Sequence, residues 1–170
     1  MSRLRSEPLT SSHDRAGFTC GVAALDDYLR RQASQDVRRH VAAVFVMVDE
    51  GDPGTVLGYY TLASYAVETR GLPEEVSKKL PRYPTTPATL IGRLARSVDQ
   101  PGMGSVLLAD ALRRALVSTE QIGSALVVVE AKDGSAAAFY RKHGFLDFPQ
   151  EKRKLFLPMK TVAAAVGKSR

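Results

Sequence analysis

A single cysteine, Cys20, stands among the 170 residues, so no intrachain disulfide can form and a cysteine-rich zinc site is excluded. The three histidines, His13, His40 and His143, do not have the spacing of metal ligands. The chain also lacks the Gly-Lys-Ser/Thr of a P-loop and the G-x-S-x-G elbow of serine hydrolases. We therefore expect no metal site, no P-loop and no Ser-His-Asp triad.

Long apolar runs are also missing. The stretch 41–48 is far too short to span a bilayer, and residues 1–7 lack the apolar core of a signal peptide. Hydrophobic residues make up 44% of the chain and charged residues 25%, which is typical of a globular domain with its own core. We expect one cytoplasmic domain over residues 1–170.

The charge is unevenly balanced. Lys and Arg number 24 against 18 Asp and Glu, which gives a net charge of +6. A basic surface suits a polyanionic partner, such as the phosphates of CoA, a nucleic acid or an acidic protein segment. The alternative is a charge that only keeps the protein in solution.

Hydrophobic periodicity predicts the first half of the chain. Val22, Leu25, Leu29 and Ala33 recur at helical spacing, so 22–35 is expected to be an amphipathic helix. Residues 1–17 look polar and irregular, and prolines predict loop or short helix over 70–87. Apolar, β-rich runs predict strands at 42–48, 56–65 and 89–97, the first two forming an antiparallel hairpin.

The second half alternates helix and strand. A glycine-bearing turn at 99–104 precedes a strongly apolar helix, and 125–129 is the continuous apolar run of a strand buried on both faces. Gly144 is suited to end a short helix at 135–143. A last strand is expected at 154–158, followed by a frayed tail from 163 to 170. This order predicts an α+β (mixed α/β) domain around one central, mostly antiparallel sheet flanked by helices.

Two segments have residues suited to chemistry. Gly102 and Gly104 precede a helix, where unpaired N–H groups and the helix dipole can bind a phosphate. An ordinary tight turn is the alternative. Tyr140 lies in the short helix after the buried strand. A tyrosine there is most often a core residue with its hydroxyl at the rim.

Together these segments resemble the GNAT superfamily of N-acetyltransferases. Residues 89–116 look like its motif A, in which a strand, a pyrophosphate loop and a helix hold CoA. Motif B is matched by Ala136, Phe139, Tyr140, Gly144 and Phe145. Two departures stand out. Asp133 replaces the usual asparagine, and Asp99 falls where the loop usually has Gln or Arg, in a loop about two residues shorter than is usual in the family.

The resemblance extends to one branch of the superfamily, the GNAT toxins of type II toxin–antitoxin modules. It implies a toxin that uses acetyl-CoA to acetylate the α-amino group of aminoacyl-tRNA and so blocks translation. It also implies a ribbon-helix-helix antitoxin, operator DNA reached through that antitoxin, and a homodimer. The matching segments are Phe18–Gly21, Leu25, Asp26, Leu29, Val44–Val46, Gly58–Leu62, Gly92–Ala95 and Leu155–Met159.

The resemblance also implies site residues. Tyr140 would be the general acid that protonates the departing thiolate, and a backbone N–H near Leu94 or Ala95 would stabilise the oxyanion. The expected acetyl-CoA-binding residues are Leu94, Ala95, Arg96, Gln100, Gly102, Met103, Gly104, Ser105, Ala136 and Phe139.

The strand at 89–96 carries two arginines and no carboxylate that could act as a base. A lysine amine, with a pKa of about 10.4, usually needs a base, whereas an α-amino group of pKa about 7.7–8.0 is substantially neutral at physiological pH. An aminoacyl-tRNA therefore fits better than a protein lysine. The candidate RNA contacts are Arg93, Arg38, Arg39, Arg141 and Lys142.

Two other hypotheses remain open at this point. One is a GNAT enzyme for a small amine or a peptide or protein amino group, which would turn over without RNA. The other is a catalytically silent GNAT-like module that binds an antitoxin and operator DNA. The short loop and Asp133 would favour the silent module, which predicts no binding of acetyl-CoA.

Overall fold

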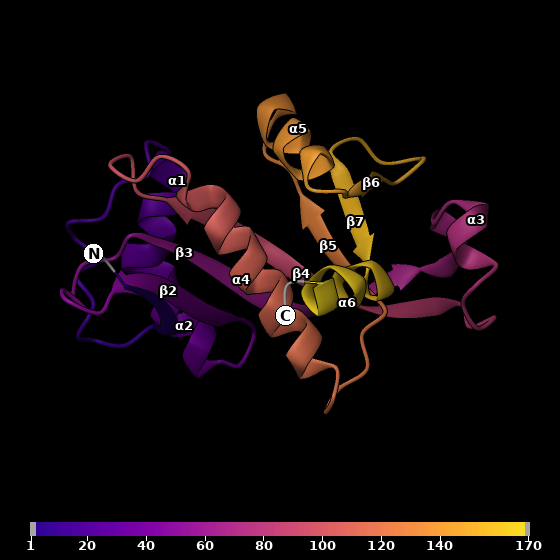
Figure 1. Ribbon diagram of the computed structural model, residues 1–170, viewed down its shortest axis with the longest axis horizontal. Coiled ribbons are helices and arrows are strands. Elements are labelled where there is room, and N and C mark those ends of the chain that lie inside the picture. Colours follow the sequence, from indigo (N-terminus) through magenta and orange to yellow (C-terminus); the bar gives the residue numbers. More distant parts are fainter. Residues whose placement is uncertain (1–2, 169–170) are drawn as a thin grey trace. The chain divides into compact units, whose positions relative to one another are not determined.

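The computed structural model describes residues 3–168 and has the mixed α/β architecture expected from the sequence (Figure 1). Its strands hydrogen-bond in the order β1-β2-β3-β4-β5-β7-β6. The β4–β5 pair is parallel, whereas β1–β2, β2–β3, β5–β7 and β6–β7 are antiparallel. The strands are β1 (Leu4–Pro8), β2 (Ala43–Asp49), β3 (Gly58–Glu68), β4 (Thr85–Arg96), β5 (Leu126–Glu130), β6 (Leu146–Asp147) and β7 (Lys154–Pro158).

Helices occupy about half of the described chain outside the strands. Within 3–168, no helix is both long and apolar enough to cross a membrane. The helical elements are α1 (Ala23–Asp27), the π-helix η1 (Tyr28–Gln32), α2 (Ala33–Arg38), the 3-10 helix η2 (Thr69–Gly71), α3 (Glu74–Ser77), α4 (Met103–Ser118), α5 (Gly134–Lys142) and α6 (Met159–Lys168).

Residue contacts divide the chain into two compact units. Unit 1 comprises residues 3–63 and 92–111 of the described chain, and unit 2 comprises 64–91 and 112–168. The expectation of a single domain over residues 1–170 stays a prediction. Each unit is described by itself below.

Unit 1 is built on the antiparallel hairpin expected from the sequence. Phe45 of β2 lies opposite Tyr60 of β3 in that register. The predicted helix at 22–35 is present and continues to Arg38, with a π-helical turn in its middle. Leu29 and Tyr59, both fully buried, belong to the core of this unit. The apolar face of the helix is thereby removed from water, which stabilises its short helical segments.

Unit 2 contains the buried strand that the continuous apolar run predicts. Residues 126–129 of β5 are 1% exposed or less, and β4 and β7 pair with the strand on its two edges. Val128 pairs with Phe156 of β7, and both side chains belong to one core cluster. The chain then leads from β5 into α5, drawn in orange in Figure 1.

Two predictions for the ends of the chain are wrong. Within the polar segment 1–17, residues 4–8 form strand β1, in which Leu4 pairs with Asp49 of β2. This strand has an exposed to half-buried pattern, so its conformation depends on pairing rather than on propensity. The tail expected to fray is instead helical through Lys168, and Met159 and Val162 of α6 are buried. Residues 169–170 of that tail lie outside the described chain.

Candidate active site

The turn between β4 and α4 has a backbone that an anion can approach. Gly102 has a φ of +84°, a left-handed conformation that favours glycine, and a Cβ built there meets no atom within 4 Å. The N–H of Gln100 donates to Ser97 O and the N–H of Met103 donates to Gln100 O, at 3.0 and 3.2 Å. These bonds close the turn and leave its outer side open at Gly102.

Helix α4 begins directly after this turn, at Met103. Gly104 and Ser105 lie in its first turn, where backbone N–H groups precede the helical hydrogen-bond ladder and the dipole is positive. Met103 is buried, whereas Ser105 is exposed and Gly104 half-buried. The turn and the helix start therefore fit the binding of a pyrophosphate group, as the sequence predicts.

One backbone N–H of strand β4 bonds to a side chain shortly before this turn. The N–H of Arg93 donates to the side-chain oxygen Oγ1 of the buried Thr61, at 3.0 Å. The preceding residue is Gly92, where a Cβ would lie only 2.9 Å from the same oxygen. A side-chain hydroxyl thus bonds to a strand N–H that would ordinarily face a backbone carbonyl. Glycine leaves room for it.

A second glycine determines how closely the rest of β4 approaches its neighbours in unit 1. At Gly58, a Cβ would lie 2.6 Å from Leu107 Cδ1 and 3.0 Å from the carbonyl oxygen of Ala95. Leu107 and Ala95 are buried, and Leu94 is half-buried. Gly58 therefore allows the α4 side chain and the β4 backbone to approach β3 more closely than any other residue would permit.

Arg93 is held by the helix that precedes β2. Its guanidinium carbon lies 3.6 Å from the centroid of the Tyr28 ring. Tyr28 donates from its hydroxyl to Asp36 at 2.7 Å, and Gln32 donates to the same carboxylate at 3.0 Å. Hydrogen bonds from Gln32 and Tyr28, followed by the charges of Arg93 and Arg39, hold the pKa of Asp36 below its usual value. Arg93 and Arg39, two predicted RNA contacts, are therefore both near Asp36.

In unit 2, helix α5 has a local signal at each end. Asp133 is the N-cap, and its carboxylate accepts a hydrogen bond from the N–H of Ala136 at 2.8 Å. Gly144 follows the helix with a φ of +92°, the left-handed conformation expected after a helix. The aspartate that stands in place of the usual asparagine therefore performs the capping role, for which the two residues are about equally suited.

Tyr140 lies in an aromatic cluster on α5. Its ring centroid is 5.3 Å from that of Phe139 and 5.4 Å from that of Phe145, and the residue is 8% exposed. Within residues 3–168, the Tyr140 hydroxyl makes no hydrogen bond. Every fully buried side-chain polar atom of these residues does have a hydrogen-bond partner. The Tyr140 hydroxyl is therefore not fully buried and reaches the surface. Burial raises the pKa of Tyr140 to about 12. The phenol therefore keeps its proton and can donate it.

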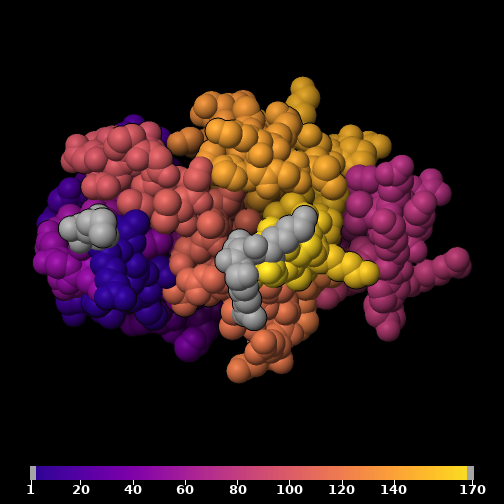
Figure 2. All heavy atoms as spheres, viewed as in Figure 1, coloured from indigo at the N-terminus to yellow at the C-terminus, as the bar shows by residue number. Residues whose placement is uncertain are grey.

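The other predicted RNA contacts differ in their partners. Arg38 and Arg39 are exposed at the end of α2 in unit 1. In unit 2, Lys142 is exposed, whereas the guanidinium of Arg141 forms a forked pair with Asp147, with Nε–Oδ2 and Nη2–Oδ1 distances of 3.0 and 2.9 Å. Figure 2 shows, in orange to yellow, the surface that α5 and the following segment present on one face. Arg141 thus has the local ion-pair partner that competes with a role in phosphate binding.

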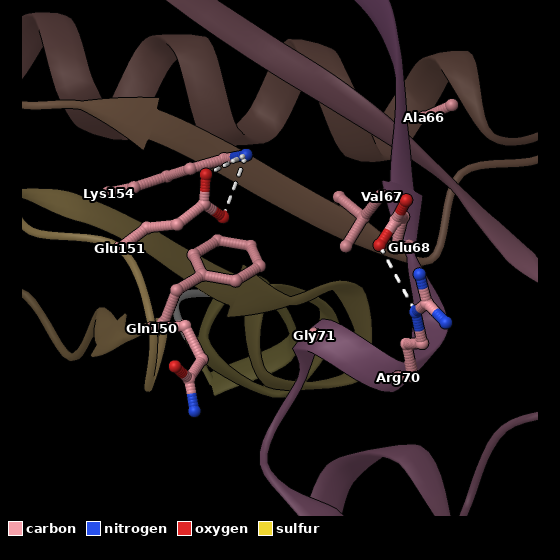
Figure 3. Close-up of a pocket in the computed structure, with 9 residues that line it drawn as sticks. Ala66, Val67, Glu68, Arg70, Gly71, Gln150, Glu151 and Lys154 are labelled. Carbon is pink, nitrogen blue, oxygen red and sulfur yellow. Dashed lines mark hydrogen bonds and ion pairs between the residues drawn. The ribbon is translucent and has the colours of Figure 1, made fainter.

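Unit 2 also contains a cavity of about 460 Å³ between the end of β3 and the segment before β7 (Figure 3). The ammonium group of Lys154 faces the carboxylate of Glu151, and Arg70 pairs with Glu68, so the charged groups of its rim are paired with each other. None of the predicted site residues lines this cavity. Its lining residues are Ala66, Val67, Glu68, Arg70, Gly71, Phe148, Gln150, Glu151 and Lys154.

Comparison with known proteins agrees with this geometry. No family model matches the chain. The chain is 32% identical to the Probable toxin TacT of Sinorhizobium fredii, over 95% of this chain and 94% of that protein. It is 33% identical to the tRNA-acetylating toxin of Mycobacterium tuberculosis, over 94% of each. Among solved structures, a tyrosine-to-phenylalanine mutant of KacT has a TM-score of 0.88 at 29% identity, covering 95% of this chain and 98% of that one.

The mixed sheet, the glycine turn before α4 and the tyrosine of α5 define an N-acetyltransferase of the GNAT class. Within that class, the chain belongs to the family of tRNA-acetylating toxins, as the similarity to the two relatives named above shows. No group of three or more His, Cys, Asp or Glu residues that could hold a metal occurs in the described part of the chain.

Three residues of the site were not found by sequence reasoning. Tyr28 and Asp36 were overlooked because they lie between the apolar positions of an amphipathic helix. Thr61 had a readable signal, since it is a polar residue in the otherwise apolar stretch 59–63. A polar side chain in a buried strand needs a hydrogen-bond partner, and here that partner is the N–H of Arg93.

Proposed function

We propose that the protein is a toxin that transfers the acetyl group of acetyl-CoA to the α-amino group of an aminoacyl-tRNA and thereby blocks translation. The observation that carries the proposal is Tyr140, a buried phenol whose hydroxyl has no partner within the described residues, in a family of tRNA-acetylating toxins. One similar structure is AtaT complexed with acetyl-methionyl-tRNAfMet, and another is AtaTR bound with AcCoA.

Acetyl-CoA supplies an acetyl thioester when bound. The open backbone at Gly102 and the positive start of α4 are suited to hold its pyrophosphate. Leu94, Ala95 and Arg96 at the end of β4 are proposed to contact it as well, with an N–H of Leu94 or Ala95 donating to the developing oxyanion. Gln100, Met103, Gly104, Ser105, Ala136 and Phe139 complete the proposed set of binding residues.

Tyr140 supplies the proton that the leaving group needs. As the new C–N bond forms and the C–S bond breaks, its hydroxyl donates a proton to the sulfur. The acceptor nitrogen loses one proton, which returns to the phenolate through water. A thiol has a pKa of about 8.5, well below that of the buried phenol, so donation must be concerted with C–S cleavage. General acid catalysis of this kind typically contributes about 10²–10⁴-fold in rate.

The acceptor class follows from the residues of strand β4. It carries Arg93 and Arg96 and no carboxylate over 89–96. An α-amino group with a pKa of about 7.7–8.0 reacts as the neutral amine near pH 8 without a strong base, and an arginine-bearing strand suits an acceptor attached to RNA. The residues proposed to contact this RNA are Arg38, Arg39, Arg93, Arg141 and Lys142.

Partners are proposed from the relatives. AtaT has been solved with the C-terminus of its antitoxin AtaR, and KacTA with DNA. For this chain we propose an antitoxin of the ribbon-helix-helix type, operator DNA bound through that antitoxin, and a homodimer. Because aminoacyl-tRNA is used in the cytoplasm, we propose that the protein acts there.

The test uses labelled acetyl-CoA with total tRNA, either charged or deacylated, beside the Tyr140→Phe variant. We expect label only in charged tRNA and loss of most of that label in the variant. Binding of acetyl-CoA to both proteins, measured by calorimetry, is the control for folding.

Other outcomes decide between the remaining alternatives. Acetyl-CoA binding with no label in RNA would overturn the proposal in favour of an enzyme for small amines or peptide amino groups. No binding of acetyl-CoA would leave the silent binding module.

A further inference from the structure

Arg93 lies at the outer end of a layered set of side chains in unit 1. The Tyr59 ring is fully buried, and the Tyr28 ring is nearly parallel to it, with a centroid distance of 6.3 Å and an angle of 14°. The guanidinium of Arg93 covers the Tyr28 ring at 3.6 Å and is half-buried. Arginine is the cation best suited to such stacking, because its guanidinium is planar.

Both rings under Arg93 are fixed by their hydroxyl groups. Tyr59 donates to the carbonyl oxygen of Leu25 at 2.6 Å, and Tyr28 donates to Asp36 at 2.7 Å. Neither ring can turn away without losing a hydrogen bond to a partly buried acceptor. The ring that the guanidinium covers is therefore held in place by the core of the unit.

The guanidinium contacts the Tyr28 ring and lies near the Asp36 carboxylate, but it has no hydrogen-bonded partner within residues 3–168. Across residues 3–168, no hydrogen bond or ion pair engages its five N–H donors, whereas the backbone N–H of Arg93 donates to Thr61. A half-exposed planar cation of this kind has an edge that can donate hydrogen bonds and a face that can stack. Arg141 is different, because Asp147 already occupies the edge of its guanidinium.

We infer that Arg93, supported by Tyr28, stacks on the terminal base of the single-stranded 3′ end of the aminoacylated RNA. The inference rests on the proposed function and specifies how the acceptor is held. Single-stranded RNA ends are commonly recognised by bases stacked on arginine planes or aromatic rings. The amino acid is esterified to the ribose of that terminal nucleotide, and Arg93 directly precedes Leu94, a proposed oxyanion donor.

Tyr28 has the role of a positioning residue, since it acts on the RNA only through Arg93. The π-helical turn Tyr28–Gln32 brings its ring under the guanidinium while the apolar residues Leu25 and Leu29 of the same helix still face the core. Short π-helical turns within helices are frequent at functional sites. This helix therefore serves both the core of the unit and the proposed contact with RNA.

The direct test is a fluorescent RNA hairpin with a 3′-terminal 2-aminopurine nucleoside that carries an amide-linked amino acid. Stacking quenches 2-aminopurine, so the wild-type protein should quench this probe. A matched hairpin with the same base inside its stem should keep its emission. Loss of quenching is expected in Arg93→Lys as much as in Arg93→Gln, because lysine keeps the charge and loses the plane.

Salt dependence separates stacking from a phosphate contact. If Arg93 neutralised a phosphate, Arg93→Lys would retain affinity for the RNA. Arg93→Gln would then make the slope of log affinity against log salt concentration shallower by about one. Stacking instead predicts that both variants raise KM for charged tRNA about tenfold, with salt slopes close to that of the wild type. Retained affinity in Arg93→Lys would overturn the inference.

The role of Tyr28 is tested by two variants. Tyr28→Phe keeps the ring and loses its hydrogen bond to Asp36, so KM for charged tRNA should rise by no more than about threefold, whereas Tyr28→Leu removes the ring and should raise KM about tenfold with kcat little changed. Equal losses in both variants, or a loss that falls on kcat alone, would contradict a positioning role. Acetyl-CoA binding by both variants shows that they are folded.

The failure of this inference is distinguishable from failure of the proposed function. If the wild-type protein acetylates charged tRNA but leaves the terminal 2-aminopurine unquenched, the stacking inference is wrong and the function stands. If charged tRNA receives no acetyl group from the wild-type protein, the function is wrong and the inference falls with it.

Discussion

The backbone N–H of Arg93 donates to the side-chain oxygen of Thr61 at 3.0 Å, within unit 1. A hydroxyl from β3 thus takes a strand hydrogen bond of β4, directly before Leu94 and Ala95, the two proposed oxyanion donors. Because the preceding residue is Gly92, the hydroxyl has the space it needs. This pair fixes the local path of the strand on which the proposed chemistry depends.

Replacing Gly92 with alanine should therefore destabilise the protein. The new Cβ would lie 2.9 Å from Thr61 Oγ1, and the crowding should lower the free energy of unfolding by about 1–3 kcal/mol. Urea denaturation measures this change. In the Gly92→Ala/Thr61→Ala double variant the clash is gone, so the loss should be smaller than the sum of the two single losses. Additive losses would show that the two residues are not coupled.

Gly102→Ala should weaken the binding of acetyl-CoA. Alanine at a φ of +84° is strained by about 1 kcal/mol, and its methyl group would project from a backbone that is now open. We expect KM for acetyl-CoA to rise while KM for charged tRNA changes little. Gly123→Ala is the matched control, because nothing lies within 4 Å of its Cβ position and its φ is not positive. An equal effect of both variants would argue against a pyrophosphate site at Gly102.

Asp133 offers a test of the helix cap. Asp133→Ala removes the acceptor for the N–H of Ala136 and should lower the free energy of unfolding by about 1 kcal/mol. Asp133→Asn should leave stability within a few tenths of a kcal/mol, because asparagine caps about as well as aspartate. Thermal or urea unfolding of the three proteins decides the matter. Equal losses in both variants would show that the carboxylate charge matters beyond the cap.

The pH profile tests the state of Tyr140. Burial disfavours the charged phenolate and raises the pKa of Tyr140 to about 12, so the proton-donating form persists up to that pH. The rate should rise as the acceptor amine loses its proton below about pH 8, and then stay level through about pH 10. An unburied tyrosine, with a pKa of about 10, would begin to lose activity there. Initial rates between pH 6 and 10.5 would measure this, and a decline that begins below pH 10 would contradict the buried phenol.

Tyr140→Phe should lower the level part of the same profile by about 10²–10⁴-fold, because the leaving thiolate then has no positioned proton donor. KM for acetyl-CoA should change little. A variant that retains more than about a tenth of the wild-type rate would remove Tyr140 from the role of general acid.

Local signals made β5 and α5 predictable. The apolar run of β5 and the glycine after α5 each act within a few residues, so the sequence shows them directly. Strand β1 could not be found in this way, because its polar residues become a strand only by pairing with β2. Helix α6 was missed because its small residues resemble a tail until Met159 and Val162 are seen to be buried.

The candidate site also contains some residues that the sequence could predict and others that it could not. Gly102 and Tyr140 belong to short motifs that could be matched in the sequence, and the conformation of Gly102 and the burial of Tyr140 fit the roles proposed for them. The contact between Tyr28 and Arg93 joins residues far apart in the chain, and Tyr28 begins a π-helical turn that the apolar spacing of 22–35 does not indicate. Only the folded structure could reveal it.

The π-helical turn Tyr28–Gln32 also constrains how this sequence can evolve. Such a turn holds one residue more than an α-helix, so losing a single codon there would restore a regular helix. The helix on either side would keep its facing, because the π-turn accommodates the extra residue locally, whereas the residues of the turn itself would change position. A ring at the position of Tyr28 would no longer lie under Arg93. Homologues that differ by one residue in this segment should therefore also differ in how they hold this arginine.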